Sequence, residues 1–242
     1  MRRILLTFAL LLLAAGGAAR ADEASDLIKR IDRVRNPYES FELDLELTSH
    51  RGASVETFRY KVSARVDGKS LVEFLAPASE KGKYLLMVDD NMWIYMPNTS
   101  RPIRISPMQR LAGDASNADV ARGRFGTDYD AVLGGSETID GRDARVVDLT
   151  ARNPDVSYTK VRLWVDKKND HPIRADFFVA SGKLFKRAHY QRYEVIDGHE
   201  MLTHVDIEDI ARPGRHTEMT YSRVRPAKLA DRLFNKDQIG KW

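Results

Sequence analysis

The sequence predicts a mainly β protein built as one antiparallel meander, either a closed barrel or a strongly curved half-barrel of about ten or eleven strands. Two observations predict this class. Many short segments alternate apolar and polar residues, and turn dipeptides such as Asp67-Gly68 and Ser181-Gly182 lie between many of them. A doubly wound α/β fold needs helices that alternate with strands, and the sequence lacks them.

Residues 1–21 have the three parts of a cleavable export signal. Met1-Arg2-Arg3 is positive, Ile4 to Leu13 is apolar, and Ala19-Arg20-Ala21 fits the small-x-small cleavage pattern. The apolar run is shorter than the roughly 20 residues that a membrane span needs. We therefore expect cleavage after Ala21, a periplasmic location, and a single domain over residues 22–242.

Charge and cysteine content narrow the possible functions. Without residues 1–21 the chain keeps 36 basic and 35 acidic residues, so the main electrostatic motive for nucleic-acid binding disappears. The sequence has no cysteine. This excludes disulfides, a thiol nucleophile, thiolate metal ligands and a lipid anchor at the cleavage site.

The elements follow from periodicity. Residues 26–35 place Leu27, Ile31 and Val34 on one face of an amphipathic helix that Asn36-Pro37 ends. Period two begins at Phe41. The expected strands are 41–48, 57–66, 71–75, 84–88, 92–96, 103–105, 145–150, 160–165, 173–179, 184–190, 201–210 and 217–224.

Residues 109–135 interrupt the strands. Ser116 and Thr127 can each cap a short helix, over 117–122 and 128–133. A 27-residue excursion is too long for an ordinary connection, so it is either a lid or a surface loop. Its apolar residues favour a helical lid, and these are Val120, Phe125, Tyr129, Val132 and Leu133.

Two strands, 84–88 and 92–96, are apolar on both faces. Both faces of the sheet centre must therefore be covered, either in a closed core or around an apolar cavity. Methionine suits a binding surface because its flexible thioether repacks around varied ligands, but it also fills gaps in ordinary cores.

The run MWIYMP at 92–97, followed by Arg101, Arg104-Ile105-Ser106-Pro107 and Gln109-Arg110, resembles the LolA-like outer-membrane lipoprotein-sorting proteins. The resemblance continues into Phe125 to Tyr129 and covers most of the mature chain in layout. It implies a LolA/LolB-like incomplete barrel with helices over the concave face and a hydrophobic cavity for acyl chains.

That resemblance implies a periplasmic carrier without enzymatic activity or cofactor. Such a carrier binds the acyl chains of a lipoprotein or lipid and moves them from an inner-membrane transporter of the ABC or RND type towards an outer-membrane acceptor. Met96 replaces the family's usual leucine, and Thr99 and Pro102 make the linker less basic. These departures are typical of a side branch whose cargo is not a lipoprotein.

The resemblance and the apolar pattern together give a set of expected binding residues. Arginines at the rim would pair with lid acids such as Asp114 or Asp119, or with a lipid phosphate, or would simply face water. The predicted rim residues are Arg101, Arg104 and Arg110. The predicted cavity residues are Phe58, Tyr60, Phe74, Leu86, Trp93, Tyr95, Ile103, Phe125, Tyr129 and Leu133.

The sequence gives weaker support for a metal site, a sensor or an enzyme than for a carrier. His199 and His204 are five residues apart in a strand-like segment, so they point to opposite faces and do not form a zinc-protease motif; we expect no metal site. A periplasmic lipid or stress sensor is the alternative function, but it would usually need a second domain. A hydrolase or isomerase would need clustered polar groups in the cavity, and no local cluster is visible.

Overall fold

The computed structural model describes residues 22–99, 101–121, 124–153 and 156–241, so the predicted export signal lies outside the described residues. A helix over residues 22–35 confirms the expected amphipathic helix. Among the described residues, no helix is long and apolar enough to cross a membrane. The other elements are β1 (Ser40–Arg51), β2 (Ser54–Arg65), β3 (Lys69–Ala76), β4 (Tyr84–Val88), β5 (Asn91–Tyr95), β6 (Ile103–Ile105), β7 (Arg110–Ala112), β8 (Ala115–Ser116), α2 (Asn117–Ala121), α3 (Phe125–Asp128), β9 (Tyr129–Ile139), β10 (Arg142–Ala151), β11 (Lys160–Asp166), β12 (Pro172–Phe178), β13 (Leu184–Ile196), β14 (His199–Asp209), β15 (Arg215–Pro226), η1 (Asp231–Phe234) and η2 (Lys236–Gln238).

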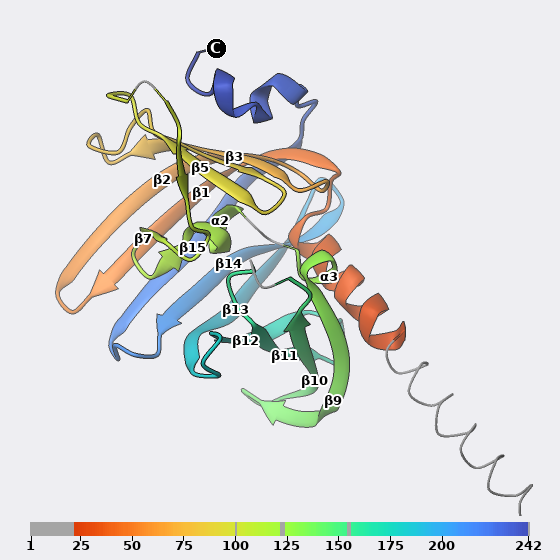
Figure 1. Ribbon diagram of the computed structural model, residues 1–242. Helices are drawn as coiled ribbons and strands as arrows, with labels where there is room; N and C mark the ends of the chain where they lie inside the picture. The colour runs from red at the N-terminus through yellow and green to blue at the C-terminus, as the bar shows by residue number, and fades with distance from the viewer. Residues whose placement is uncertain (1–21, 100, 122–123, 154–155, 242) are drawn as a thin grey trace, which may run out of the picture.

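Thirteen of the strands form one antiparallel sheet that is strongly curved and does not close into a barrel (Figure 1). Its order is β6-β5-β4-β3-β2-β1-β15-β14-β13-β12-β11-β10-β9. The chain first runs outward from β1 to one edge, then restarts at the opposite edge and runs inward to β15, which pairs with β1. The predicted mainly β, incomplete-barrel fold is confirmed.

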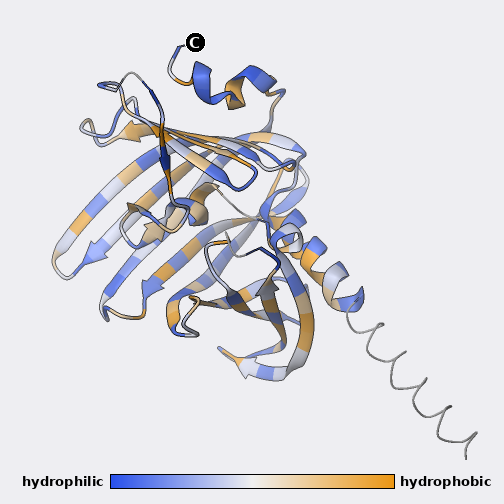
Figure 2. Ribbon diagram, viewed as in Figure 1, coloured by the Kyte–Doolittle hydropathy of each residue, from blue (hydrophilic) through white to orange (hydrophobic). Residues whose placement is uncertain are grey.

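Period two decides which face of each strand is buried. In β1 every second residue from Phe41 to Leu47 is buried, and the residues between them are acidic or polar. Figure 2 shows this alternation along the long strands. The buried side chains of β1 belong to one large core on the concave face, which also takes Leu27 and Ile31 from the N-terminal helix.

The doubly apolar strands β4 and β5 divide between two cores. Leu85, Met87 and Met92 belong to the concave core. Leu86 lies in a separate core on the other face, against Phe234 and Ile239 of the C-terminal segment, where Trp93 and Tyr95 also pack. The C-terminal segment therefore covers the outer face of the sheet centre, as its place above β3 and β5 in Figure 1 shows.

One segment joins the two free edges of the sheet. We call residues 106–128, between β6 and β9, the crossover segment; it contains the β7–β8 hairpin and helices α2 and α3. The expected excursion over 109–135 ends at residue 128, because β9 begins at Tyr129. The prediction of a helix over 128–133 is therefore wrong. The start of β9 alternates buried or half-buried residues, Tyr129, Ala131 and Leu133, with exposed ones. This run of period two is short and ends at Gly134-Gly135, so the sequence alone did not show it as a strand.

We predict that Phe234→Ala lowers the free energy of unfolding by about 3–5 kcal/mol, the usual cost of removing a buried phenylalanine. Phe234 is 5% exposed in the outer core, and the Arg65 guanidinium lies over its ring. Urea unfolding measures the loss. Val195→Ala is the control, since Val195 is 73% exposed and its loss should cost less than about 0.5 kcal/mol. Equal effects would mean that the C-terminal segment does not cover the sheet.

Candidate functional site

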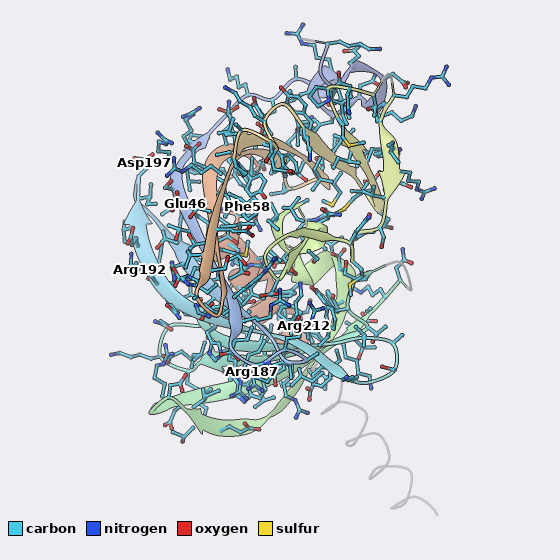
Figure 3. The ribbon with its side chains drawn as sticks, turned by 90° about the vertical axis from the view of Figure 1, so that its left-hand side faces the viewer. Glu46, Phe58, Arg187, Arg192, Asp197 and Arg212 are labelled. Carbon is cyan, nitrogen blue, oxygen red and sulfur yellow. The ribbon has the colours of Figure 1, made fainter. Side chains whose placement is uncertain are left out.

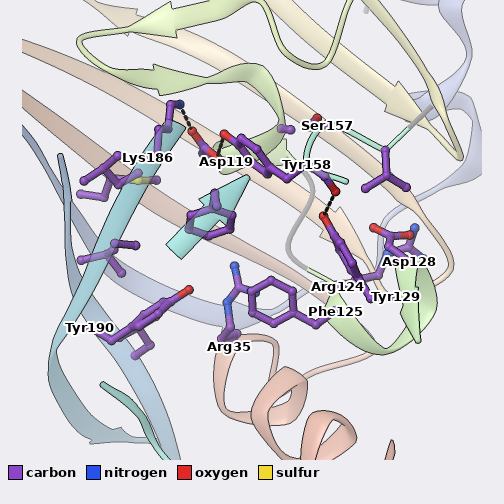
Figure 4. Close-up of a pocket in the computed structure, with 18 of the residues that line it drawn as sticks. Arg35, Asp119, Arg124, Phe125, Asp128, Tyr129, Ser157, Tyr158, Lys186 and Tyr190 are labelled. Atoms are coloured by element: carbon purple, nitrogen blue, oxygen red, sulfur yellow. Dashed lines mark hydrogen bonds and ion pairs between the residues drawn. The ribbon is translucent and has the colours of Figure 1, made fainter. Parts of the chain in front are cut away.

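A pocket lies on the concave side of the sheet, between the end of the N-terminal helix, the crossover segment and strands β13 to β15 (Figure 4). Its lining is mostly apolar and aromatic, and its charged members lie among these side chains. Its volume is about 70 Å³. Its lining includes Arg35, Asp119, Phe125, Tyr129, Tyr158, Lys186, Tyr190, Leu202 and Tyr221.

A second pocket of about 70 Å³ adjoins the first. Both are lined by Arg35, Asp119, Leu202 and Tyr221, and the second also reaches the apolar face of β1 and β2. Each volume has room for only a few water molecules. The shared side chains divide one apolar space into two parts, and this space must widen before it can take an acyl chain.

A buried ion pair fastens α2 to the sheet. Asp119 Oδ2 lies 2.7 Å from Lys186 Nζ of β13, and both side chains are less than 10% exposed. The Tyr158 hydroxyl donates to Asp119 Oδ1 at 2.8 Å, and the backbone N–H of Ser116 donates to Asp119 Oδ2 at 2.8 Å. The remaining hydrogen-bonding capacity of the carboxylate is therefore used, which a buried charge requires.

The surroundings shift the pKa of both acidic groups. Burial by itself raises the pKa of Asp119, but the adjacent Lys186 ammonium and the hydrogen bonds outweigh it, so the net shift is downward. Burial and the nearby Asp119 charge raise the pKa of Tyr158 well above its ordinary value. At neutral pH the pocket wall thus holds the Asp119 carboxylate and the neutral Tyr158 phenol.

Asp32 joins the N-terminal helix to the crossover segment. Its two carboxylate oxygens accept the backbone N–H groups of Phe125 and Gly126 at 2.9 and 2.8 Å. These are orphan donors at the start of α3, where a carboxylate is favourable. A side chain at Gly126 would place its Cβ 3.2 Å from Asp32 Oδ2, so glycine lets the two elements approach.

The β7–β8 hairpin docks on the opposite wall by close backbone approach. Gly113 has a φ of +56°, and a Cβ there would lie 2.3 Å from Thr217 Oγ1. The Asp114 N–H donates to the same oxygen at 2.8 Å. The turn therefore requires glycine for both its conformation and its contact with β15.

The structure brings some of the predicted cavity residues together. Phe125 and Tyr129 line the first pocket, with their rings edge to face. Tyr60 and Phe74 are buried in the same concave core. Phe58 and Leu133 are partly buried and pack against that core, outside the two pockets.

The remaining predicted cavity residues lie elsewhere. Leu86, Trp93 and Tyr95 face the C-terminal segment on the outer side, so we correct their placement and do not retain them as cavity residues. When both faces of a strand are apolar, its sequence does not predict which face lies on the concave side of the sheet. Ile103 is 47% exposed on the edge strand β6.

The predicted rim arginines do not converge on the pocket. Arg101 joins Trp93 and Tyr95 around an outer depression of about 420 Å³, whose other members include Lys236 and Lys241. Arg104 donates to Asn91. The backbone of Arg110 pairs with Ser116 in the hairpin, and its side chain lies outside the described part of the structure. The expected lid acid Asp119 pairs with Lys186 instead.

Sequence reasoning named the acid Asp119 but missed the basic residues of the pocket, Arg35 and Lys186. Lys186 carried a usable signal, because it shares the inward face of β13 with Ala188 and Tyr190, where a lysine is out of place. Arg35 carried a weaker one as the last residue of the amphipathic helix. Nothing local linked either residue to Asp119.

Among the described residues, one group could hold a metal ion. His50, His216 and Glu218 offer ligand atoms within 4.8 Å of one another, on the outward-facing residues of β1 and β15. His216 lies at the start of β15, close to the β14–β15 turn in which Figure 3 labels Arg212. It does not line the pocket.

Comparison with known proteins places this geometry in a family. A LolA superfamily protein of solved structure from Nitrosomonas europaea is 34% identical, covering 88% of this chain and 98% of its own, with a TM-score of 0.83. The chain belongs to the LolA superfamily. A family model described as "Uncharacterized protein" matches residues 66–241.

Two further solved structures resemble this LolA superfamily member. A DUF1329 family protein from Desulfovibrio piger is 28% identical, covering 91% of this chain and 99% of its own, with a TM-score of 0.78. An outer membrane lipoprotein-sorting protein domain from Vibrio parahaemolyticus has the same fold at 20% identity, with coverages of 91% and 99% and a TM-score of 0.76. The comparison with curated proteins gives no match.

We predict that Asp119→Asn destabilises the protein by about 3–5 kcal/mol, because it leaves the Lys186 charge buried without a partner. Asp119→Asn combined with Lys186→Met should recover most of that loss. Asp148→Asn breaks a half-exposed pair with Arg162 and should cost less than about 1 kcal/mol. Urea unfolding at pH 7 measures all three.

The same pair gives a pH dependence. A carboxyl whose folded pKa is depressed stabilises the protein above its unfolded pKa and loses this contribution as pH falls through the folded pKa. For Asp119 the loss therefore begins near its ordinary value of 3.8 and continues below it. Asp119→Asn should flatten that part of the curve; an unchanged slope would contradict the assignment.

Proposed function

We propose that this LolA superfamily member is a periplasmic, non-enzymatic carrier that holds acyl chains of a lipid or lipoprotein between the curved sheet and the crossover segment. The observation that carries the proposal is the pair of adjoining apolar pockets on the concave face. The related domain described as lipoprotein-sorting supports the same reading. Export would follow from residues 1–21 as a cleaved signal, leaving residues 22–242 as one domain.

Cargo entry requires the pockets to widen. Two spaces of about 70 Å³ cannot hold a long acyl chain. The crossover segment is the element that can move, because separable polar contacts hold it rather than a continuous strand ladder. These contacts are the Asp119–Lys186 pair, the Asp32 cap on α3, and the 3.1 Å hydrogen bond from Ser70 Oγ to the Ala121 carbonyl.

Transfer would need outside partners. An acyl chain gains about 0.8 kcal/mol per buried CH₂ in either a bilayer or a protein cavity, so loading is nearly balanced. The direction must then come from elsewhere. We propose that an inner-membrane transporter of the ABC or RND type loads the carrier and that an outer-membrane acceptor empties it.

We predict that a disulfide between Ser70→Cys and Ala121→Cys slows exchange of a fluorescent fatty acid at least about tenfold relative to the same protein when reduced, because it fixes α2 to β3. The chain has no native cysteine, so the pair is unique. Exchange is followed by stopped-flow fluorescence after mixing with lipid vesicles, with each single cysteine variant as a control.

Two outcomes would count against this account. Equal exchange rates in the oxidised and reduced forms would remove the crossover segment from the mechanism. A folded, delipidated wild-type protein that shows no saturable binding of the probe would remove the carrier function itself.

A further inference from the structure

One basic side chain of the pocket, Arg35, has a shielded nitrogen without a hydrogen-bond partner. Arg35 ends the N-terminal helix, and its guanidinium projects into the pocket with Cζ 4.7 Å from the centre of the Phe125 ring (Figure 4). Its Nη1 atom is shielded from solvent and makes no hydrogen bond. In the described parts of the chain, no carboxylate lies within ion-pair distance of this guanidinium.

The nearest acids are already engaged. Asp32, one turn earlier on the same helix, accepts the two N–H groups at the start of α3. Asp119, across the pocket, is paired with Lys186. The Asp119–Lys186 pair is neutral as a unit, and Asp32 attracts the Arg35 charge without forming an ion pair with it. Nη1 of Arg35 therefore keeps its hydrogen-bonding capacity within the apolar space.

An arginine in this position cannot lower its cost by losing a proton, because its pKa stays above the accessible range. A shielded N–H donor without a partner is unfavourable, and Nη1 of this half-buried guanidinium is one. The position is explained if a ligand supplies an anion to it. A guanidinium can bind a carboxylate or a phosphate through two parallel hydrogen bonds.

Two tyrosine hydroxyl groups near Arg35 could also donate hydrogen bonds to a bound anion. Tyr190 and Tyr221 line the same pocket as Arg35. Burial raises the pKa of both, and that of Tyr221 to about 12, so both remain neutral hydroxyl groups that can donate to an anion. The apolar walls that would take a hydrocarbon chain extend to either side, because Arg35 borders both pockets.

We propose that Arg35 binds the anionic headgroup of an amphiphilic cargo, whose acyl chain fills the two adjoining pockets. The inference rests on the proposed carrier function and narrows its cargo to anionic amphiphiles. The headgroup is a carboxylate, as in a free fatty acid, or a phosphate, as in a phospholipid. A neutral acylated group lacks the anion that this guanidinium requires.

The test compares three ligands that share an oleoyl or oleyl chain: oleate, oleoyl lysophosphatidic acid and oleyl alcohol. Each displaces a fluorescent fatty acid from delipidated protein at pH 8, below the ligands' micelle concentrations. Wild type should bind the better anion at least about tenfold more tightly than the alcohol. The ratio between the two anions then identifies the headgroup source.

Arg35→Gln removes the charge while keeping a polar side chain of similar reach. It should weaken binding of the preferred anion by about 10- to 100-fold, the value of a charge-assisted hydrogen bond, and leave the alcohol within about twofold. Arg35→Lys should restore part of the preference. Arg33→Gln, an exposed arginine on the same helix, is the matched control and should change nothing.

A second readout does not depend on ligand affinity. Without ligand, Arg35→Gln should be at least as thermally stable as wild type, because it removes a half-buried charge whose Nη1 has no hydrogen-bond partner. Oleate should raise the Tm of wild type more than that of the variant. A purely structural arginine would give the opposite order of stability.

The outcomes separate the two proposals. If wild type binds all three ligands equally, or if Arg35→Gln binds the anions as tightly as wild type, the headgroup site is overturned and the carrier function stands. If folded wild type binds none of them, both are overturned. If the variant is markedly less stable without ligand, Arg35 is structural and the headgroup site is again overturned.

Discussion

The connection between the two free edges of the sheet constrains the rest of the molecule. The sheet is open between β6 and β9, and the chain must travel from one of these edges to the other. In a strongly curved sheet this path crosses the concave side, so the described residues of the crossover segment, 106–121 and 124–128, lie over the apolar face that β1, β2 and the later strands present. The cover, the pockets beneath it and the polar contacts that hold it all follow from that path.

The crossover segment is held to the sheet by apolar packing and separate polar contacts rather than by a strand ladder. Neighbouring strands share regular backbone hydrogen bonds, whereas the crossover segment meets the walls through an ion pair, a carboxylate cap and a glycine contact. Each of these contacts involves only a few neighbouring residues and can break without disrupting the strands. Buried ion pairs add little net stability but impose a specific arrangement, which suits an element that must return to one closed position.

The sequence predicted the sheet well because its strands carry their own signal. Alternation from Phe41 onward, together with the turn dipeptides, located nearly every strand, and the MWIYMP run located the family. The face of β5 that turns inward was not predictable, because Met92 and Trp93 are both apolar and only the C-terminal segment decides which of them faces the outer core. The meeting of the pocket charges was not predictable either, since Arg35, Asp119 and Lys186 come from three distant elements.

The most direct test is to identify the ligand that co-purifies with the protein. The protein, expressed with residues 1–21 and isolated from cells without detergent, can be examined by native mass spectrometry, and its bound species can be released and identified by fragmentation. The account predicts one amphiphile per chain with an acyl tail and a carboxylate or phosphate head, retained by wild type and depleted in Arg35→Gln. A folded wild-type protein that carries no acyl-chain species would contradict it.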